Sequence, residues 1–92
     1  MESIYLDNNL KLSFEKLPHT TRLIVSKNDE EWVCRKEKLE KLLAFTDINQ
    51  TQAFKGRLRL IKSNHNIDIQ VKNNYIGTIA AEKFKQVLNN LK

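Results

Sequence analysis

Short runs in which apolar and polar residues alternate place the strongest constraint on how this chain can fold. In the second half, Leu58 and Leu60 alternate with arginines, and Ile67, Ile69 and Val71 alternate with polar residues. A period of two residues puts the apolar side chains on one face of a strand and the polar ones on the other. These runs therefore predict two strands, each with one buried face.

The polar segments around these runs predict how the strands pair. We expect residues 63–66 to form a four-residue loop, and residues 73–74 to form a two-residue turn with both asparagines at positive φ. A third strand then follows the turn. The resulting register predicts these cross-strand pairs: Leu60 with Ile69, Leu58 with Val71, Val71 with Ile76, and Lys72 with Tyr75.

The end of the chain changes to a helical period. Phe84, Val87, Leu88 and Leu91 follow the spacing i, i+3, i+4 and i+7. This spacing makes one apolar stripe on a helix. We expect a helix from about Ala80 to Leu91.

The start of the chain alternates in the same way as the second half. A three-residue loop at 7–9 would place Leu6 opposite Leu10 and Ile4 opposite Leu12, and asparagine tolerates the left-handed conformation that such a loop needs. The sequence thus predicts an N-terminal hairpin, followed by a connection at 15–20. Its apolar face would hold Ile4, Leu6, Leu10, Leu12 and Phe14.

The segment 22–45 fits two structures. One is a long helix from Asp29, with Asn28 as its N-cap and Glu31 as its capping-box partner. In that helix, however, Trp32 would lie beside charged residues instead of on an apolar stripe.

The alternative pairs Arg22–Ser26 with Glu31–Arg35 across a polar loop at 27–30. Apolar residues then meet across the strands, Val25 with Trp32 and Leu23 with Cys34. We prefer this hairpin because Trp, Val and Cys in succession favour a strand. A short helix from about Lys36 to Phe45 would follow and carry Leu39, Leu42 and Leu43.

These elements predict an α+β fold with a mostly antiparallel sheet. We expect about six or seven short strands, with two short helices packed on one face and each β-rich half ending in a helix. The chain forms one domain at 1–92, with a first half at 1–46, a linker at 46–53 and a second half at 54–92.

Two short segments of the first half are weakly similar in sequence to segments of the second half, and we call these similarities echoes. Glu37–Leu43 is similar to Glu82–Leu88, and Arg22–Ile24 is similar to Arg59–Ile61, but the two echoes have different offsets. Chance similarity between lysine-rich amphipathic helices explains the first echo as well as duplication does. The order of strands followed by a packing helix resembles, in architecture alone, the single-strand-binding proteins of the Pur and Whirly type. No motif of this chain matches theirs, and 92 residues are too few for two full copies of such repeats.

Few residues are suited to catalysis or metal binding. His19, His65 and Cys34 stand apart in the sequence, whereas zinc sites need ligands in paired, close spacing. We expect Cys34 to be a buried structural residue beside Trp32 and Leu23. The only glycines, Gly56 and Gly77, are too far apart for a phosphate-binding loop. We therefore expect no enzyme, no metal and no cofactor.

One cysteine and the absence of long apolar runs suggest a location. A single cysteine allows no disulfide within the chain, which fits a cytoplasmic protein. The first residues lack the basic and apolar regions of a secretory signal, and no apolar run approaches the roughly 20 residues needed to span a membrane. We expect a cytoplasmic protein without a membrane partner.

The net positive charge lies entirely in the second half. Residues 1–46 hold eight Lys/Arg and eight Asp/Glu, whereas residues 47–92 hold eight Lys/Arg and three Asp/Glu, and the whole chain carries +5. The predicted register turns basic, polar and aromatic side chains to the outward face, a combination that suits single-stranded nucleic acid. The candidate nucleic-acid-binding residues are Lys55, Arg57, Arg59, Gln70, Lys72 and Tyr75.

Two other hypotheses remain open. The outward cations can simply be solvated, since a sheet covered on one face needs polar residues on the other. Alternatively, the chain is a protein-interaction module, such as a small inhibitor, immunity or anti-defence protein that masks an acidic or nucleic-acid-handling partner. Ile61 on the outward face would favour such a partner, and an open edge strand at Arg22–Ser26 or Ile4–Leu6 would allow partner pairing or a homodimer.

Overall fold

The computed structural model describes residues 2–47, 52–54 and 56–92. The first half contains four strands and a helix: β1 (Glu2–Tyr5), β2 (Leu10–Lys16), β3 (Thr21–Lys27), β4 (Glu30–Glu37) and α1 (Leu39–Asp47). The second half repeats this order: β5 (Gln52–Ala53), β6 (Leu58–Ser63), β7 (Asn66–Val71), β8 (Asn74–Ala80) and α2 (Ala81–Asn90).

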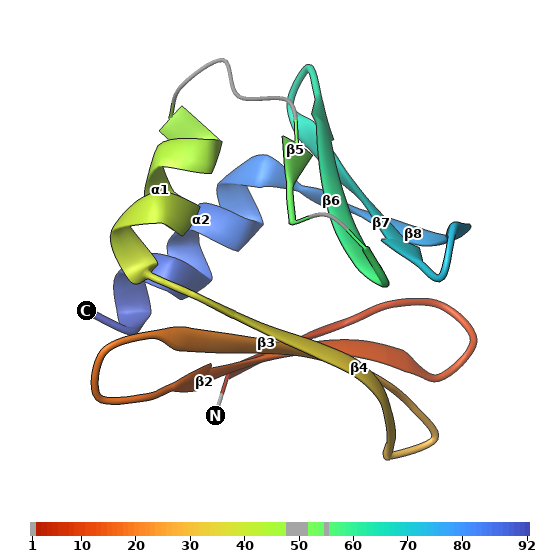
Figure 1. Ribbon diagram of the computed structural model, residues 1–92. Helices are drawn as coiled ribbons and strands as arrows, with labels where there is room; N and C mark the ends of the chain where they lie inside the picture. Colours follow the sequence, from red (N-terminus) through yellow and green to blue (C-terminus); the bar gives the residue numbers. More distant parts are fainter. Residues whose placement is uncertain (1, 48–51, 55) are drawn as a thin grey trace.

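The strands form two antiparallel sheets, and the helices lie together beside them (Figure 1). Each sheet has four strands in sequence order, β1-β2-β3-β4 and β5-β6-β7-β8. The predicted α+β class is confirmed. Within the described residues there are two helices and, besides the two-residue β5, seven strands. The division into two sheets is a feature that the sequence pattern did not predict.

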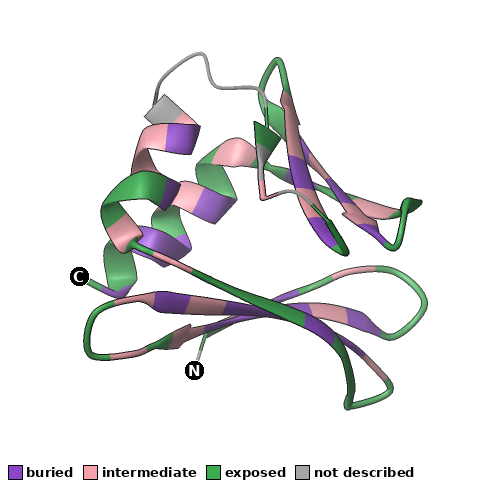
Figure 2. Ribbon diagram, viewed as in Figure 1, coloured by how far each residue is buried: buried purple, intermediate pink, exposed green. Residues whose placement is uncertain are grey.

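One hydrophobic core joins both sheets and both helices. The ring of Phe84 on α2 lies at its centre, 5.4 Å from the ring of Phe14 on β2 and 6.2 Å from the ring of Phe45 on α1. Both pairs meet edge to face, the arrangement that aromatic quadrupoles favour. Figure 2 shows buried residues on strands of both sheets and on both helices. The two halves therefore fold around shared side chains.

Two predicted registers are confirmed. Ile4 pairs with Leu12 in the first hairpin, whose loop places Asn8 and Asn9 at φ values of 60° and 62°. In the second sheet, Leu60 pairs with Ile69 and Leu58 pairs with Val71. The loop between β6 and β7 is shorter than predicted, because Ser63 and Asn66 already pair with each other.

The predicted register between β3 and β4 is wrong by one residue. Val25 pairs with Val33 instead of Trp32, and Leu23 pairs with Arg35 instead of Cys34. The chain turns through Asn28 and Asp29 alone, both at positive φ, and a bulge at Trp32 absorbs one residue of β4. Val33 therefore faces the core, where Trp32 was expected.

The same kind of shift occurs between β7 and β8. Lys72 and Asn73 form the turn, with φ values of 52° and 70°, instead of residues 73–74. Because the turn lies one residue earlier, Val71 pairs with Asn74 instead of Ile76, and Tyr75 pairs with Gln70 instead of Lys72. A bulge at Ile76 then shifts the register by one residue for the rest of β8.

The two bulges show that the halves share a structural repeat. The register shifts between Val25 and Ser26 in the first sheet and between Ile69 and Gln70 in the second, 44 residues further along the chain. Two complete units of four strands and a helix therefore fit into 92 residues, contrary to the expectation from length. They fit because the strands are short and several turns need only two residues. The echo between Arg22–Ile24 and Arg59–Ile61 is not part of this repeat, since one lies on β3 and the other on β6.

The helices differ slightly from their predicted bounds. Lys36 belongs to β4, because α1 begins at Leu39, and α2 begins at Ala81. The expected linker at 46–53 is shorter, since Thr46 belongs to α1 and residues 52–53 form β5. Residues 48–51 lie outside the described residues.

Helix α1 has no basic residue in its last turn, but Lys62 of β6 donates from Nζ to the carbonyl oxygens of Phe45 and Thr46 at 3.3 and 2.9 Å. This cation complements the helix dipole.

Removal of the Phe84 ring should weaken the whole fold. Phe84→Ala should lower the free energy of unfolding by about 3–5 kcal/mol, because it leaves a cavity between the two halves. Urea denaturation followed by circular dichroism measures the change. The exposed neighbour Lys83 provides the control, and Lys83→Ala should change stability by less than about 0.5 kcal/mol. A loss below about 1 kcal/mol for Phe84→Ala would contradict a shared core.

Candidate nucleic-acid interface

Three of the candidate residues form one row across the outward face of the second sheet. Arg59 of β6 pairs with Gln70 of β7, and Gln70 pairs with Tyr75 of β8. Arg59 lies between buried leucines and Gln70 between Ile69 and Val71, which are also buried, so both side chains turn outward. Tyr75 is 61% exposed. The row thus presents a guanidinium, an amide and an aromatic ring side by side.

Two further cations lie at the turn end of this row. Both Arg57 and Lys72 are exposed, and the backbone N–H of Lys72 donates to the carbonyl oxygen of Arg57 at 2.7 Å. Lys72 lies in the turn, so the predicted position opposite Tyr75 is wrong. Lys55 lies outside the described residues. We define the basic row as Arg57, Arg59, Gln70, Lys72 and Tyr75.

A chain of hydrogen bonds holds the Tyr75 side chain. The hydroxyl of Thr78 donates to the Asp68 carboxylate at 2.7 Å, and the hydroxyls of Tyr75 and Thr78 are 2.6 Å apart. Because Thr78 gives its proton to Asp68, Tyr75 donates to Thr78. The phenol ring is thereby restrained while much of it stays exposed. Asp68 lies between the buried Ile67 and Ile69 and so faces outward, but no sequence pattern indicated its link to Tyr75.

The cations of the basic row differ from Arg22 of the first sheet in their partners. In the first sheet, Arg22 forms ion pairs with Glu15 at 3.5 Å and Glu31 at 2.9 Å. Among the described residues, Arg57, Arg59 and Lys72 form no ion pair. The Nε of Arg59 is also buried and has no hydrogen-bond acceptor among them. Positive charge that is not neutralised in an ion pair attracts polyanions most strongly.

The positive charge of the second half does not all lie on the predicted surface. The ammonium of Lys62 is held at the end of α1, and Lys83, Lys85 and Lys92 lie on α2 or after it. Asp68 adds a negative charge in the neighbouring row of the sheet, where it pairs with Ile61. The cationic surface is therefore narrower than the sequence suggested and lies toward the β7–β8 turn.

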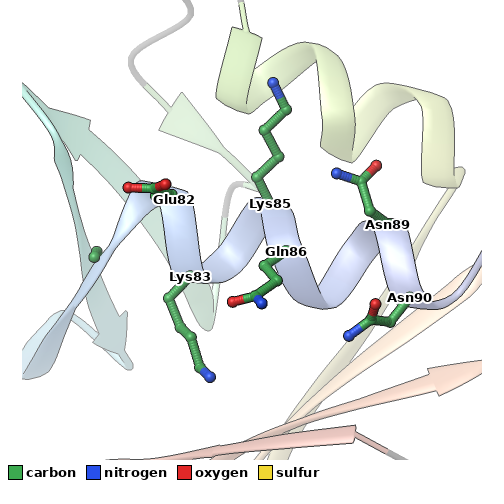
Figure 3. Close-up of a pocket in the computed structure, with 7 residues that line it drawn as sticks. Glu82, Lys83, Lys85, Gln86, Asn89 and Asn90 are labelled. Carbon is green, nitrogen blue, oxygen red and sulfur yellow. The ribbon is translucent and has the colours of Figure 1, made fainter.

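A separate hollow of about 600 Å³ lies along the exposed side of α2 (Figure 3). Its side chains do not point to a common centre, since Lys83 and Lys85 extend in opposite directions. Nucleophilic or acid–base chemistry needs groups that converge on one reacting atom. This surface therefore has no arrangement for catalysis.

The described part of the chain contains neither a cluster of metal ligands nor a membrane-spanning helix. No group of three or more His, Cys, Asp or Glu side chains there is placed to hold a metal ion. None of the helices in that part is long and apolar enough to cross a membrane.

Cys34 is exposed, so the prediction of a buried structural cysteine is wrong. The cause is the one-residue shift between β3 and β4. With a period of two, such a shift moves each side chain to the opposite face of the sheet. Cys34 now pairs with Ile24 and lies outside the core.

The chain matches no family model, no curated protein and no solved structure.

The exposure of Cys34 can be measured directly. In the folded protein, Cys34 should react with a small thiol reagent at a rate within about tenfold of the rate in urea, because its sulfur is accessible to solvent. The reaction with an aromatic disulfide reagent, followed by absorbance, measures both rates. A thiol that reacts only after unfolding would show that β4 has the register first predicted from the sequence.

Proposed function

We propose that this protein is a small, non-enzymatic accessory protein that binds single-stranded DNA or RNA on the outward face of the second sheet. The observation that carries the proposal is the basic row itself. Arg59, Gln70 and Tyr75 lie next to one another across three strands. The cations Arg57, Arg59 and Lys72 form no ion pair with the described residues.

The chemistry of the row favours a single strand over a duplex. An exposed tyrosine can stack on a base only if that base has left its own stack, which single strands allow. The restraint on the Tyr75 hydroxyl lowers the entropy that the ring would lose on binding. Gln70 offers both a donor and an acceptor to a base edge beside the ring. Cations at the turn would hold the phosphates, and the single cysteine of the chain is compatible with a cytoplasmic setting.

Loss of two arginines should reduce both the affinity and its dependence on salt. Four phosphate contacts, from Lys55, Arg57, Arg59 and Lys72, would give a slope of about −3 for log affinity against log salt. Arg57/Arg59→Ala should reduce this slope to about −1.4, because two contacts remain. Fluorescence anisotropy of a labelled oligothymidylate across a salt series measures the change.

A control with equal charge tests whether position matters. Lys41 and Lys83 are exposed on the two helices, outside the second sheet that carries the row. Lys41/Lys83→Ala removes the same charge and should leave the slope near that of the wild type. Equal effects of the two double variants would show non-specific attraction to the whole protein, and no binding by wild type at low salt would reject the function.

Tyr75 should contribute through its ring and not through its hydroxyl. Tyr75→Ala should weaken binding by about 1–3 kcal/mol, the contribution of one base–aromatic stack. Tyr75→Phe should keep most of the affinity, because the ring remains although the hydrogen bond to Thr78 is lost. Anisotropy titrations at one salt concentration compare the variants. A phenylalanine variant as weak as the alanine variant would indicate that the hydroxyl is the group that contacts the ligand.

A protein-interaction module is the second candidate. It is favoured by the neighbouring row, in which the partly buried Ile61 pairs with Asp68. Sheet edges offer a second route to a partner or a homodimer. The predicted edge at Arg22–Ser26 is wrong, since β3 lies inside its sheet, whereas β1 is an edge as predicted. A pull-down that returns one stoichiometric protein, together with no binding of oligonucleotides, would support this candidate.

A further inference from the structure

A groove between the two sheets brings a second exposed tyrosine close to the basic row. The groove has a volume of about 570 Å³ and is formed by the end of β1, the loop after it and the first part of β8. Figure 1 shows the β1–β2 loop and the β7–β8 turn on the same side of the molecule. The lining residues are Tyr5, Leu6, Asp7, Asn8, Tyr75, Ile76, Gly77 and Thr78.

Gly77 explains how the two sheet edges come together. A Cβ atom added to Gly77 would lie 3.5 Å from both terminal carbons of Leu6, so the Leu6 side chain rests against the backbone of β8. This contact sets Tyr5, the residue before Leu6, at the same groove as Tyr75. The two rings are 79% and 61% exposed, the largest values for large aromatic or apolar side chains of the described residues.

Tyr5 belongs to a row that corresponds to the basic row. In the first sheet, Tyr5 pairs with Lys11, and Lys11 pairs with Ser26. Ser26 lies beside the bulge of its sheet, as Gln70 lies beside the bulge of the second sheet. Lys11 and Arg59 thus occupy equivalent positions in the two units. The aromatic residue stands at the β1 end of one row and at the β8 end of the other, and those two ends meet at the groove.

We propose that a single strand bound to the basic row continues through this groove onto the first sheet, with one base stacked on Tyr75 and another on Tyr5. This inference rests on the proposed function. The groove itself holds no Lys or Arg and includes Asp7. The bases therefore turn into the groove, and the phosphates pass on its outer side toward Arg59 and Lys11. The ammonium of Lys11 lies 3.4 Å from the exposed carboxylate of Asp29, a weak pair that a phosphate can replace.

Trp32 is less suited than Tyr5 to stack on a base of the bound strand, although it is 42% exposed. It lies on β4, the opposite edge of the first sheet, directly after Glu30 and Glu31. These carboxylates would repel phosphates. Its ring also lies under the ammonium of Lys27, at 5.6 Å, and so already has a cationic partner. Trp32 therefore serves as the aromatic control.

Ligands of two lengths distinguish the contributions of Tyr5 and Tyr75 to the affinity. We would measure the affinity of oligothymidylates of about 4 and about 12 nucleotides, near the ends of the range of site sizes known for single-strand-binding folds. Tyr75→Ala should weaken both ligands. Tyr5→Ala should weaken only the longer one, by about 5- to 150-fold, because the shorter one ends before the groove. Tyr5→Phe should bind like the wild type, and so should Trp32→Ala.

Each other result has a defined meaning. If Tyr5→Ala binds the longer ligand as tightly as the wild type while Tyr75→Ala is weakened, the path through the groove is wrong and the proposed function stands. Equal losses for Tyr5→Ala and Trp32→Ala, or an equal loss with both ligand lengths, would also overturn the path. If the wild type binds neither ligand at low salt, the proposed function itself fails, and the path fails with it.

Discussion

The surface of this protein depends on where its two-residue turns lie. Asn28 with Asp29 and Lys72 with Asn73 all adopt positive φ, the conformation that makes a hairpin turn match the twist of its strands. Each turn sets a register that would bring the wrong residues into the core if it continued unchanged. A bulge a few residues later corrects the register in both sheets. Turn and bulge together decide which side chains face outward.

The accuracy of sequence-based prediction follows from this constraint. The register of β6 and β7 was predictable, because only one alignment buries Leu58 and Leu60 opposite Val71 and Ile69. Where a bulge follows the turn, apolar periodicity is misleading, since an extra residue reverses the faces beyond it. Cys34 was therefore expected in the core and is exposed. The preference of asparagine for turns was also a poor guide at 72–74, because Lys72 takes a left-handed conformation and Asn74 belongs to β8.

The candidate site was predictable to the extent that it depends on alternation alone. Arg59 and Gln70 lie between buried neighbours on strands of regular register, so their outward direction followed from the sequence. The partners of Tyr75 did not, because its pairing with Gln70 depends on the turn at Lys72 and Asn73, and its hydrogen bond to Thr78 spans the bulge at Ile76. Nor could composition show which cations are neutralised. Some acids and bases of the first half form specific pairs, such as Arg22 with Glu31, whereas Lys62 of the second half donates hydrogen bonds to the end of α1.

The repeat places corresponding rows on two sheets that share one core, and this arrangement matters for binding. A single four-stranded sheet offers a short surface, and its outward row ends at an edge strand. Here the edge of one sheet, β8, lies against the end of β1 in the other, with Leu6 packed on Gly77. The two outward rows therefore meet instead of ending separately. The units differ in the position of the aromatic residue, and that difference is what brings Tyr5 and Tyr75 to the same groove. Because Phe84 packs against Phe14 and Phe45, the shared core holds together the two units that carry these tyrosines.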